Sequence, residues 1–371
     1  MISDRWVEQY ISHDGIYLLN HSVGLPLRSL ESTATTDFWQ PWRNADSEIW
    51  THWLAAIDSF RAQLAFLLNG EKDSFCPQTS LSSAVAKILD SLPVDKERNC
   101  ILMSEEDFPS IAFALQKAGG AGYRLKFIPA EADTSDIDVW DQQTTSDVAM
   151  VLVTHVQSNN GRQLPVQLIT NLSRQKNILS LVDIAQSAAI LPIDLQAWAA
   201  DFVVGSCVKW IGGGPGAGFL WVSPDVIERC EPQSVGWFSH SNPFEFDIHN
   251  FNYAPDALRF WGGTPSVLPY VVASHSLKFI NNIGVDNIRA HNIVLVDKII
   301  QAISPEDLVS PMELERRGGT LILDFRDRDQ DMIKRLRDAH VQFDARAKGI
   351  RLSPHLCNNS QQIDALIKFL N

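Results

Sequence analysis

The stretch FVVGSCVKWIGGGPGAGFLWV, residues 202–222, places one lysine between an apolar run and a segment with five glycines. The run FVVGSCV is typical of a buried strand, and GFLWV after the glycines has the same character. Lys209 therefore comes directly after a strand, with Trp210 and Ile211 beside it. Lysines usually lie where water reaches them, so an amine in apolar surroundings indicates a chemical role.

Short apolar segments alternate with helical segments along much of the chain. Stretches such as SIAFALQKAG and PVQLITNLSRQ separate the candidate strands and have helical character. This alternation predicts the α/β class, with a mostly parallel sheet covered by helices. The candidate strands are residues 100–104, 123–128, 148–155, 178–184, 202–208 and 218–222.

The pattern changes along the chain and suggests three parts. Residues 1–50 form an N-terminal segment, residues 51–285 a large domain that begins with a helix, and residues 286–371 a smaller C-terminal α/β domain. Residues 224–265 are rich in proline, asparagine and aromatic residues, which predicts an extended loop. A helix is expected after that loop, over residues 266–283.

The composition favours a small-molecule ligand. The 371 residues are 45% hydrophobic and carry a net charge of -13, which argues against nucleic acid or an anionic membrane as the partner. The five cysteines are scattered and never spaced CxxC, which predicts reduced thiols and no metal site. The chain shows neither an apolar run of about 18 residues nor a signal peptide, so a cytoplasmic protein is expected.

Asp183 ends the apolar strand at residues 178–184, and Lys209 lies 26 residues further on, after the next strand. Ligands bind at the carboxyl ends of parallel strands, so both groups can face one crevice. The alternatives are a helix-capping aspartate and a surface lysine. Pyridoxal phosphate enzymes combine a lysine that forms a Schiff base with an acidic residue that pairs with the pyridine nitrogen of the cofactor. The two residues together predict that cofactor.

Such a cofactor also needs a phosphate site. Thr79 and Ser80 stand at the start of a predicted helix, where backbone N–H groups and the helix dipole favour an anion. Ser206, three residues before Lys209, can add another hydroxyl. An ordinary capped helix is the alternative for the first pair. The glycines after Lys209 do not form a dinucleotide motif, because a strand signature rather than a helix follows them.

Residues 182–210, VDIAQSAAILPIDLQAWAADFVVGSCVKW, resemble the cofactor segment of the class-V, fold-type-I pyridoxal phosphate enzymes. The likeness extends from about residue 15 to the C-terminus, and the closest pattern is kynureninase. The stretches that resemble kynureninase are SEEDFPS at 104–110, SVGWFSH at 234–240, RFWGGTPS at 259–266 and DARAKGIRLSPHLCNNS at 344–360.

The resemblance implies a seven-stranded type of sheet and a role for several residues. Phe108 would stack on the cofactor ring, and Trp237 and Thr264 would contact its phosphate, with Thr264 supplied by the other subunit of a homodimer. Gln186 would hydrogen-bond the cofactor's phenolic oxygen or the Schiff-base region. Arg351 would hold the carboxylate of an amino-acid substrate. The N-terminal segment would lie on the substrate side.

The chain departs from the kynureninase pattern at three positions. Val208 stands where kynureninases have tyrosine, Gln186 where histidine is usual, and Ile111 where aspartate is expected. Cys357, six residues after Arg351, suggests a cysteine desulfurase as an alternative. A class-V aminotransferase and a non-catalytic binding module also remain open. The sequence predicts a pyridoxal phosphate enzyme with kynureninase-like chemistry ahead of these.

Overall fold

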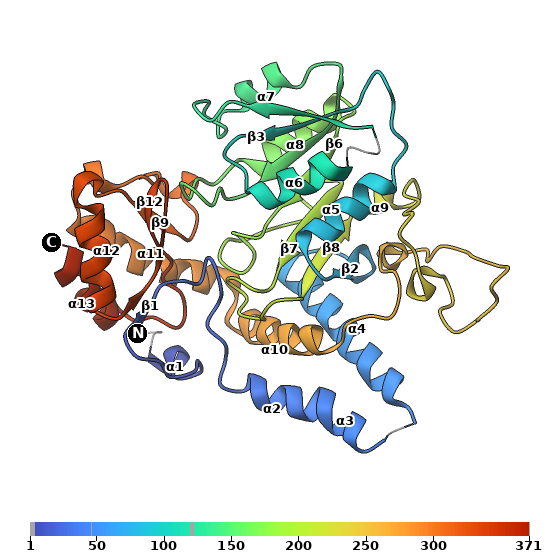
Figure 1. Ribbon diagram of the computed structural model, residues 1–371, viewed down its shortest axis with the longest axis horizontal. Coiled ribbons are helices and arrows are strands. Elements are labelled where there is room, and N and C mark those ends of the chain that lie inside the picture. Colours follow the sequence, from blue (N-terminus) through green and yellow to red (C-terminus); the bar gives the residue numbers. More distant parts are fainter. Residues whose placement is uncertain (1–3, 46, 119–121, 371) are drawn as a thin grey trace.

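The computed structural model describes residues 4–45, 47–118 and 122–370 (Figure 1). Its main sheet has seven strands in the order β2-β8-β7-β6-β5-β3-β4. The five strands from β7 to β4 run parallel, and β8 is antiparallel to β2 and β7. The predicted α/β class is therefore confirmed. The strands are β2 (Phe75–Gln78), β3 (Cys100–Ser104), β4 (Arg124–Ile128), β5 (Val148–Thr154), β6 (Leu179–Asp183), β7 (Phe202–Ser206) and β8 (Gly218–Val222).

Six of these strands follow the apolar segments that the sequence indicated, and β2 was missed. Its sequence FCPQ is short and contains Pro77, which cannot donate a hydrogen bond to a neighbouring strand. The strand lies at the edge of the sheet, where only one partner is needed, and pairs Pro77 with Phe219 of β8. A proline is tolerated at a sheet edge, so this segment forms a strand although its proline argued against one.

Helices cover both faces of the sheet because consecutive strand residues point to opposite sides. Leu181 and Val204 belong to the core shared with helices α5 (Leu81–Asp90) and α6 (Pro109–Ala118). Val182 and Val203 belong to the other core. That second core is shared with α4 (Ile49–Leu68), α8 (Val166–Gln175) and α10 (Leu268–Ile283). The smaller helix α7 (Ile137–Gln143) contributes Trp140 to it.

The C-terminal part forms a second unit with its own core, drawn in orange and red in Figure 1. Its antiparallel sheet has the order β11-β12-β9 and is packed with three helices. Strand β1 (Ile16–Tyr17) pairs with β10 (Val341–Gln342), which attaches the N-terminal segment to this unit. The unit's elements are α11 (Val285–Ala302), β9 (Leu321–Leu323), α12 (Asp329–Asp338), β11 (Asp344–Arg346), β12 (Gly349–Leu352) and α13 (Ser360–Leu370).

Two connecting regions complete the fold. The N-terminal segment contains the short helices α1 (Asp4–Val7), α2 (Leu30–Ala34) and α3 (Gln40–Arg43), with a π-helical turn between the last two. The segment after β8 is mostly irregular, as predicted, apart from α9 (Pro224–Ile227) and two short 3-10 turns. The division into parts near residues 50 and 285 stays a prediction. Among the described residues, no helix is both long and apolar enough to span a membrane.

Gly205 offers a test of how closely β7 and β8 pack. A Cβ at this position would lie 2.2 Å from a ring carbon of Phe219, which is fully buried. Overpacking of this kind costs about 1–3 kcal/mol, so we expect Gly205→Ala to lower the free energy of unfolding by that amount in urea denaturation. Gly263→Ala is the control, because nothing lies within 4 Å of its Cβ position. Equal stability of the two variants would contradict this packing.

Candidate active site

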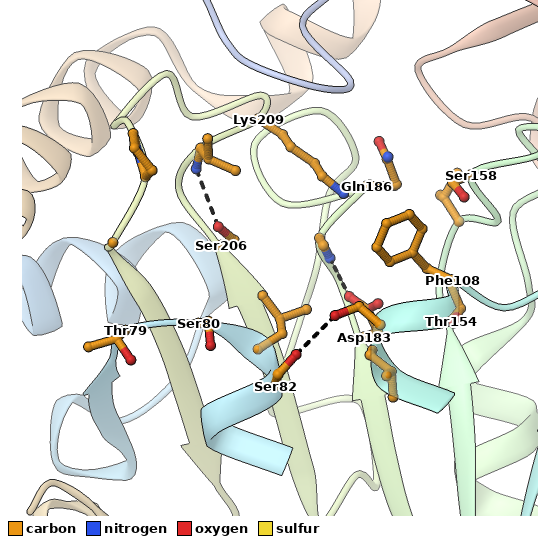
Figure 2. Close-up of a pocket in the computed structure, with 18 residues that line it drawn as sticks. Thr79, Ser80, Ser82, Phe108, Thr154, Ser158, Asp183, Gln186, Ser206 and Lys209 are labelled. Carbon is orange, nitrogen blue, oxygen red and sulfur yellow. Dashed lines mark hydrogen bonds between the residues drawn. The ribbon is translucent and has the colours of Figure 1, made fainter. Parts of the chain in front are cut away.

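A cavity of about 340 Å³ opens at the carboxyl ends of β5, β6 and β7. Thr154, Asp183 and Ser206 are the last residues of these strands, and all three line it. Parallel strands end at the same edge of a sheet, which is why residues far apart in sequence meet here. Seven of the residues predicted to bind the cofactor line this cavity (Figure 2): Thr79, Ser80, Phe108, Asp183, Gln186, Ser206 and Lys209.

Lys209 is held by a tight loop that follows β7. Gly213 N–H donates to Cys207 O at 2.8 Å, and Gly212 N–H donates to Lys209 O at 2.8 Å. Gly212 and Gly214 have positive φ angles, which glycine adopts without strain. The lysine side chain crosses the pocket, and its Nζ lies 5.7 Å from the centre of the Phe108 ring (Figure 2). The glycine-rich loop therefore positions the amine inside the cavity.

The two ionisable groups of the pocket have shifted pKa values. Burial lowers the pKa of Lys209 to about 8, with smaller contributions from Arg351 and Arg346, while Asp183 acts in the opposite direction. Burial raises the pKa of Asp183, and Lys209 and the Ala185 N–H group oppose that change. Asp183 Oδ1 accepts this N–H at 2.7 Å in a turn. The lysine thus has a substantial neutral, nucleophilic fraction near neutral pH.

Hydroxyl groups gather where α5 begins. Ser80 caps the helix: its Oγ accepts from Ser83 N–H at 3.2 Å, and Ser83 Oγ accepts from Ser80 N–H at 3.2 Å. Thr79 and Ser80 are exposed to the cavity. Gly218 lets β8 approach this point, since a Cβ there would lie 3.0 Å from Gln78 O. A capped helix start with hydroxyl groups exposed to the cavity suits an anion, so the capping and anion-site interpretations are compatible.

Trp237 and Thr264 are not among the residues that line the cavity of this chain, and their phosphate contacts stay predictions. Trp237 Nε1 lies 3.3 Å from Thr264 Oγ1, so the two are paired with each other. The Trp237 ring packs in an aromatic cluster with Trp50, Phe238 and Phe244. Within one chain both residues stand apart from the cavity, and a phosphate contact by either depends on a second chain.

Gln186 lines the cavity, and its amide group also makes contacts within the protein. Its Nε2 donates to His21 O at 3.1 Å, and its Oε1 accepts from Trp210 Nε1 at 3.4 Å. The side chain therefore joins the N-terminal segment to the loop that carries Lys209. Its predicted contact with a cofactor stays a prediction.

Arg351 lies behind the cavity wall. The residue is 2% exposed, and its Nη1 donates to the carbonyl oxygen of Ser158, a cavity residue, at 3.0 Å. Its Nε and Nη2 pair with the carboxylate of Asp344. The predicted substrate-binding arginine is thus close to the cavity but already paired.

Cys357 is buried, and burial raises the pKa of its thiol to about 12. It contacts the amide of Asn20 rather than a cation that would favour the thiolate. All five cysteines are buried. Since the thiolate is the nucleophilic form, this geometry disfavours a catalytic Cys357.

Sequence reasoning missed four polar residues of the cavity: Ser82, Ser110, Thr154 and Ser158. Ser158 Oγ is buried without a hydrogen-bond partner among the described residues, which is unusual for a buried polar group. Thr154 could have been found, because it ends an apolar strand as Asp183 does. The neighbouring His155 is a core residue: it packs edge-on against Trp198, and burial lowers its pKa to about 3.

The family model for aminotransferase class-V matches residues 43–366. The chain belongs to the class-V aminotransferase family. It is 31% identical to a kynureninase of Deinococcus radiodurans over 322 residues, which are 82% of this chain and 77% of that protein. It is 27% identical to a kynureninase of Shouchella clausii over 369 residues, 94% of this chain and 85% of that protein. An uncharacterized aminotransferase, YcbU of Bacillus subtilis, is 26% identical over 84% of this chain and 83% of its own length.

Solved structures with the same fold include a cysteine desulfurase from Thermococcus onnurineus, with a TM-score of 0.87 and 17% identity. That match covers 99% of this chain and 97% of the desulfurase. The cystine C-S lyase C-DES gives a TM-score of 0.86 at 18% identity, covering 96% and 97% of the two chains. At such identities the likeness shows the fold alone, which is that of the fold-type-I enzymes.

The cofactor of this class-V enzyme is pyridoxal 5'-phosphate. The cavity residues fit it. A lysine amine lies across from the face of Phe108, a buried carboxylate stands at the end of β6, and hydroxyl groups surround the start of α5. The unpartnered Ser158 Oγ also indicates that the cavity accommodates a polar ligand.

The lowered pKa of Lys209 predicts how attachment of the cofactor depends on pH. Only the neutral amine attacks an aldehyde, so the attachment rate of the apoprotein should rise about tenfold per pH unit and level off above about pH 8. Asp183→Asn should move this plateau to lower pH, because Asp183 raises the pKa of Lys209. Stopped-flow absorbance measures the rate, and Nα-acetyl-lysine provides the reference. An attachment rate that keeps rising above pH 8, as the rate for Nα-acetyl-lysine does, would contradict the lowered pKa of Lys209.

Proposed function

We propose that this class-V enzyme acts on an amino acid and cleaves a bond in the substrate side chain beyond the β-carbon, as a kynureninase does. The observation that carries the proposal is the placement of Lys209, Asp183 and Phe108 around one cavity in a chain 31% identical to a kynureninase. Pyridoxal phosphate, when bound, withdraws electrons from the substrate and so stabilises a carbanion. The protein residues bind the reactants and move protons.

Lys209 has two proposed tasks. Its neutral Nζ would hold the cofactor through the aldehyde group, and as a free amine it would accept the proton from the substrate α-carbon. A pKa of about 8 suits both tasks, because the amine is neither fully protonated nor too weak a base near neutral pH. Asp183 would pair with the pyridine nitrogen, and the charge of its carboxylate would keep that nitrogen protonated.

The remaining residues hold the cofactor and the substrate. Phe108 covers one face of the ring, and Gln186 approaches the phenolic oxygen. The phosphate is bound by Thr79, Ser80 and Ser206 of one chain and by Trp237 and Thr264 of the partner in a homodimer. Arg351 receives the substrate carboxylate.

Three positions separate this pocket from the kynureninase pattern. Val208 and Ile111 line the cavity and place apolar side chains where kynureninases have a tyrosine and an aspartate. Tyrosine and aspartate can each donate or accept a proton, whereas valine and isoleucine cannot. Lys209 would therefore carry a larger share of the proton transfers in this pocket. We therefore expect slower hydrolysis of kynurenine than this pattern usually supports.

A second candidate is β-elimination from a sulfur-containing amino acid. The fold neighbours include a cystine C-S lyase, and the apolar side chains of Val208 and Ile111 in the cavity suit a sulfur leaving group. Such an elimination needs no cysteine nucleophile, in agreement with the burial of Cys357. Desulfuration through Cys357 is therefore the weaker alternative. Transamination would be recognised by conversion of the cofactor to its amine form.

The deciding experiment records visible spectra and products with L-kynurenine, 3-hydroxy-L-kynurenine, L-cysteine, L-cystine and L-alanine. Anthranilate-type products would support the first candidate, and sulfide or persulfide release unaffected by Cys357→Ser would support the second. Loss of release in Cys357→Ser would instead favour desulfuration. A protein that takes up the cofactor but leaves all five amino acids unchanged would favour the binding-module alternative.

Replacement of Lys209 tests the mechanism that these reactions share. We expect Lys209→Ala to lose the visible band of the lysine-linked cofactor and to abolish turnover, because no other amine replaces Nζ in the pocket. Lys334→Ala, at an exposed position on α12, is the control and should keep both. Turnover retained in Lys209→Ala would contradict the proposed role of Lys209.

A further inference from the structure

Two arginines and one aspartate stand together at the hairpin formed by β11 and β12. Asp344 pairs across the hairpin with Arg351, and Arg346 ends β11 two residues further on. Arg346 and Arg351 both contribute to the lowered pKa of Lys209, so their positive charges act on the pocket. Asp344 is the carboxylate that lies between the two arginines.

Arg351 is the buried member of this group. Only 2% of its side chain is exposed, and its guanidinium forms two parallel hydrogen bonds with Asp344, one of them 2.7 Å long. The third side of the guanidinium donates to Ser158 O at 3.0 Å. A substrate carboxylate can form the same two-pronged pair only on the edge that Asp344 now occupies.

Asp344 is ionised and well supplied with partners. Burial alone would raise its pKa, but hydrogen bonds from His21 and Arg351 outweigh that effect and hold the pKa well below the usual range. Its Oδ1 lies 2.9 Å from Nε2 of His21. Its side chain is 29% exposed, in contrast to the nearly buried Arg351. The aspartate is thus the more accessible half of the pair.

Arg346 is a second, more exposed cation beside this pair, and its ion pair with Asp344 is longer than that of Arg351. Its side chain is 40% exposed, and its Nε lies 3.9 Å from Asp344 Oδ2, too far for a hydrogen bond. It makes no hydrogen bond to any other residue that the structure describes. Its guanidinium carbon stands 5.6 Å from the centre of the Phe108 ring. A small rotation of Asp344 would bring the carboxylate to this arginine.

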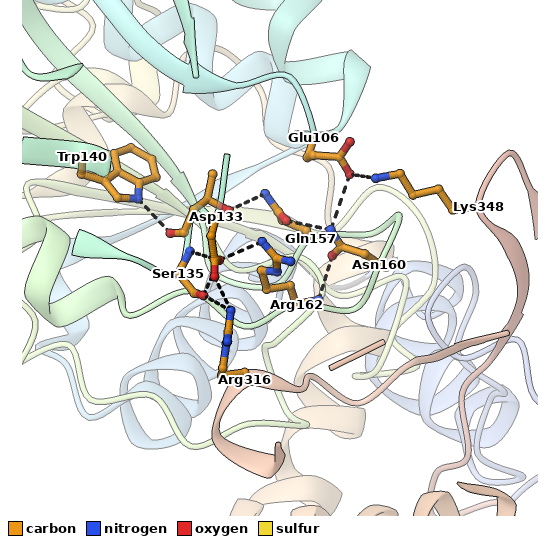
Figure 3. A network of polar contacts seen from close by, with 10 residues as sticks. Glu106, Asp133, Ser135, Trp140, Gln157, Asn160, Arg162, Arg316 and Lys348 are labelled. Atoms are coloured by element: carbon orange, nitrogen blue, oxygen red, sulfur yellow. Dashed lines mark hydrogen bonds and ion pairs between the residues drawn. The ribbon is translucent and has the colours of Figure 1, made fainter. Parts of the chain in front are cut away.

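The hairpin is fixed to the pocket by a polar network (Figure 3). Lys348, in the turn of the hairpin, donates to Glu106 Oε2 at 2.5 Å, and Asn160 lies 3.5 Å from the same oxygen. Glu106 is two residues before Phe108, so this contact holds Arg346 over the ring. This contact fixes the hairpin that carries both arginines relative to the cavity. The side chain of Asp344 lies within reach of either arginine.

We propose that Asp344 occupies the carboxylate site on Arg351 and passes to Arg346 when the carboxylate of an amino-acid substrate binds. This inference rests on the proposed function. Exchange of one carboxylate for another avoids leaving the buried guanidinium unpaired, which is strongly unfavourable. Asp344 keeps His21 as a partner and gains Arg346. The pair Asp344 and Arg346 then determines how strongly the site selects ligands that carry a carboxylate.

The test compares two amines on the cofactor-loaded protein. L-Alanine and ethylamine differ by a carboxylate, and changes in the visible spectrum report the dissociation constant of each. The quantity of interest is the ratio of the two constants. We expect Asp344→Asn to strengthen L-alanine binding relative to ethylamine about tenfold, because the competing charge is removed while an oxygen remains for His21.

Arg346→Gln should have the opposite effect and weaken relative L-alanine binding several-fold, because the displaced Asp344 loses its new partner. In the Asp344→Asn background the same change should have little effect. The matched controls are Asp338→Asn and Arg337→Gln, exposed positions on α12 that change the same charges away from the pocket. Both controls should leave the ratio unchanged.

Weaker relative binding of L-alanine in Asp344→Asn would overturn the inference, since Asp344 would then serve to orient Arg351. If that variant does not fold, the exposed Arg346→Gln decides alone, and an unchanged ratio rejects the exchange. If the wild-type spectrum responds to both amines and the variants have the same ratio of dissociation constants as the wild type, only this inference is refuted. A wild-type spectrum that responds to neither amine refutes the proposed function as well.

Discussion

The structure depends on keeping an amine and a carboxylate in one pocket away from bulk water. Asp183 and Lys209 follow neighbouring parallel strands, and burial disfavours the charged form of each. Each charge offsets part of the cost of burying the other, which a lone buried charge could not do. The N-terminal segment helps to hold this arrangement: Gly24 N–H donates to Val208 O at 2.8 Å, and a Cβ on Gly24 would lie 2.0 Å from Lys209 O.

Parts of the chain that are distant in sequence meet behind the wall of the pocket. His21 comes from the N-terminal segment, Ser158 from the loop after β5, and the β11–β12 hairpin from the C-terminal unit. Arg351 joins these parts, because one guanidinium contacts both Ser158 and Asp344. Strand β1, paired with β10, keeps the N-terminal segment against the C-terminal unit. The contacts of Arg351 therefore arise only when these distant parts pack together.

Much of the fold could be predicted because its signals are local. Apolar runs of five to eight residues marked six strands of the main sheet, and polar residues at their ends marked Asp183 and Ser206. The short edge strand with Pro77 gave no such signal, since its place depends on pairing with β8. Ser158 was equally hidden, because nothing in its neighbours shows that its hydroxyl is buried beside a cavity.

The sequence by itself determined the α/β alternation, the strand ends that carry the pocket and the cofactor class, since each follows from neighbouring residues or short motifs. Only the tertiary structure decided that Cys357 is buried, that Trp237 and Thr264 stand outside the cavity of their own chain, and that Asp344 pairs with Arg351. The physical reason is that burial and ion pairing depend on the atoms that packing brings near. For these residues those atoms belong largely to other elements of the chain.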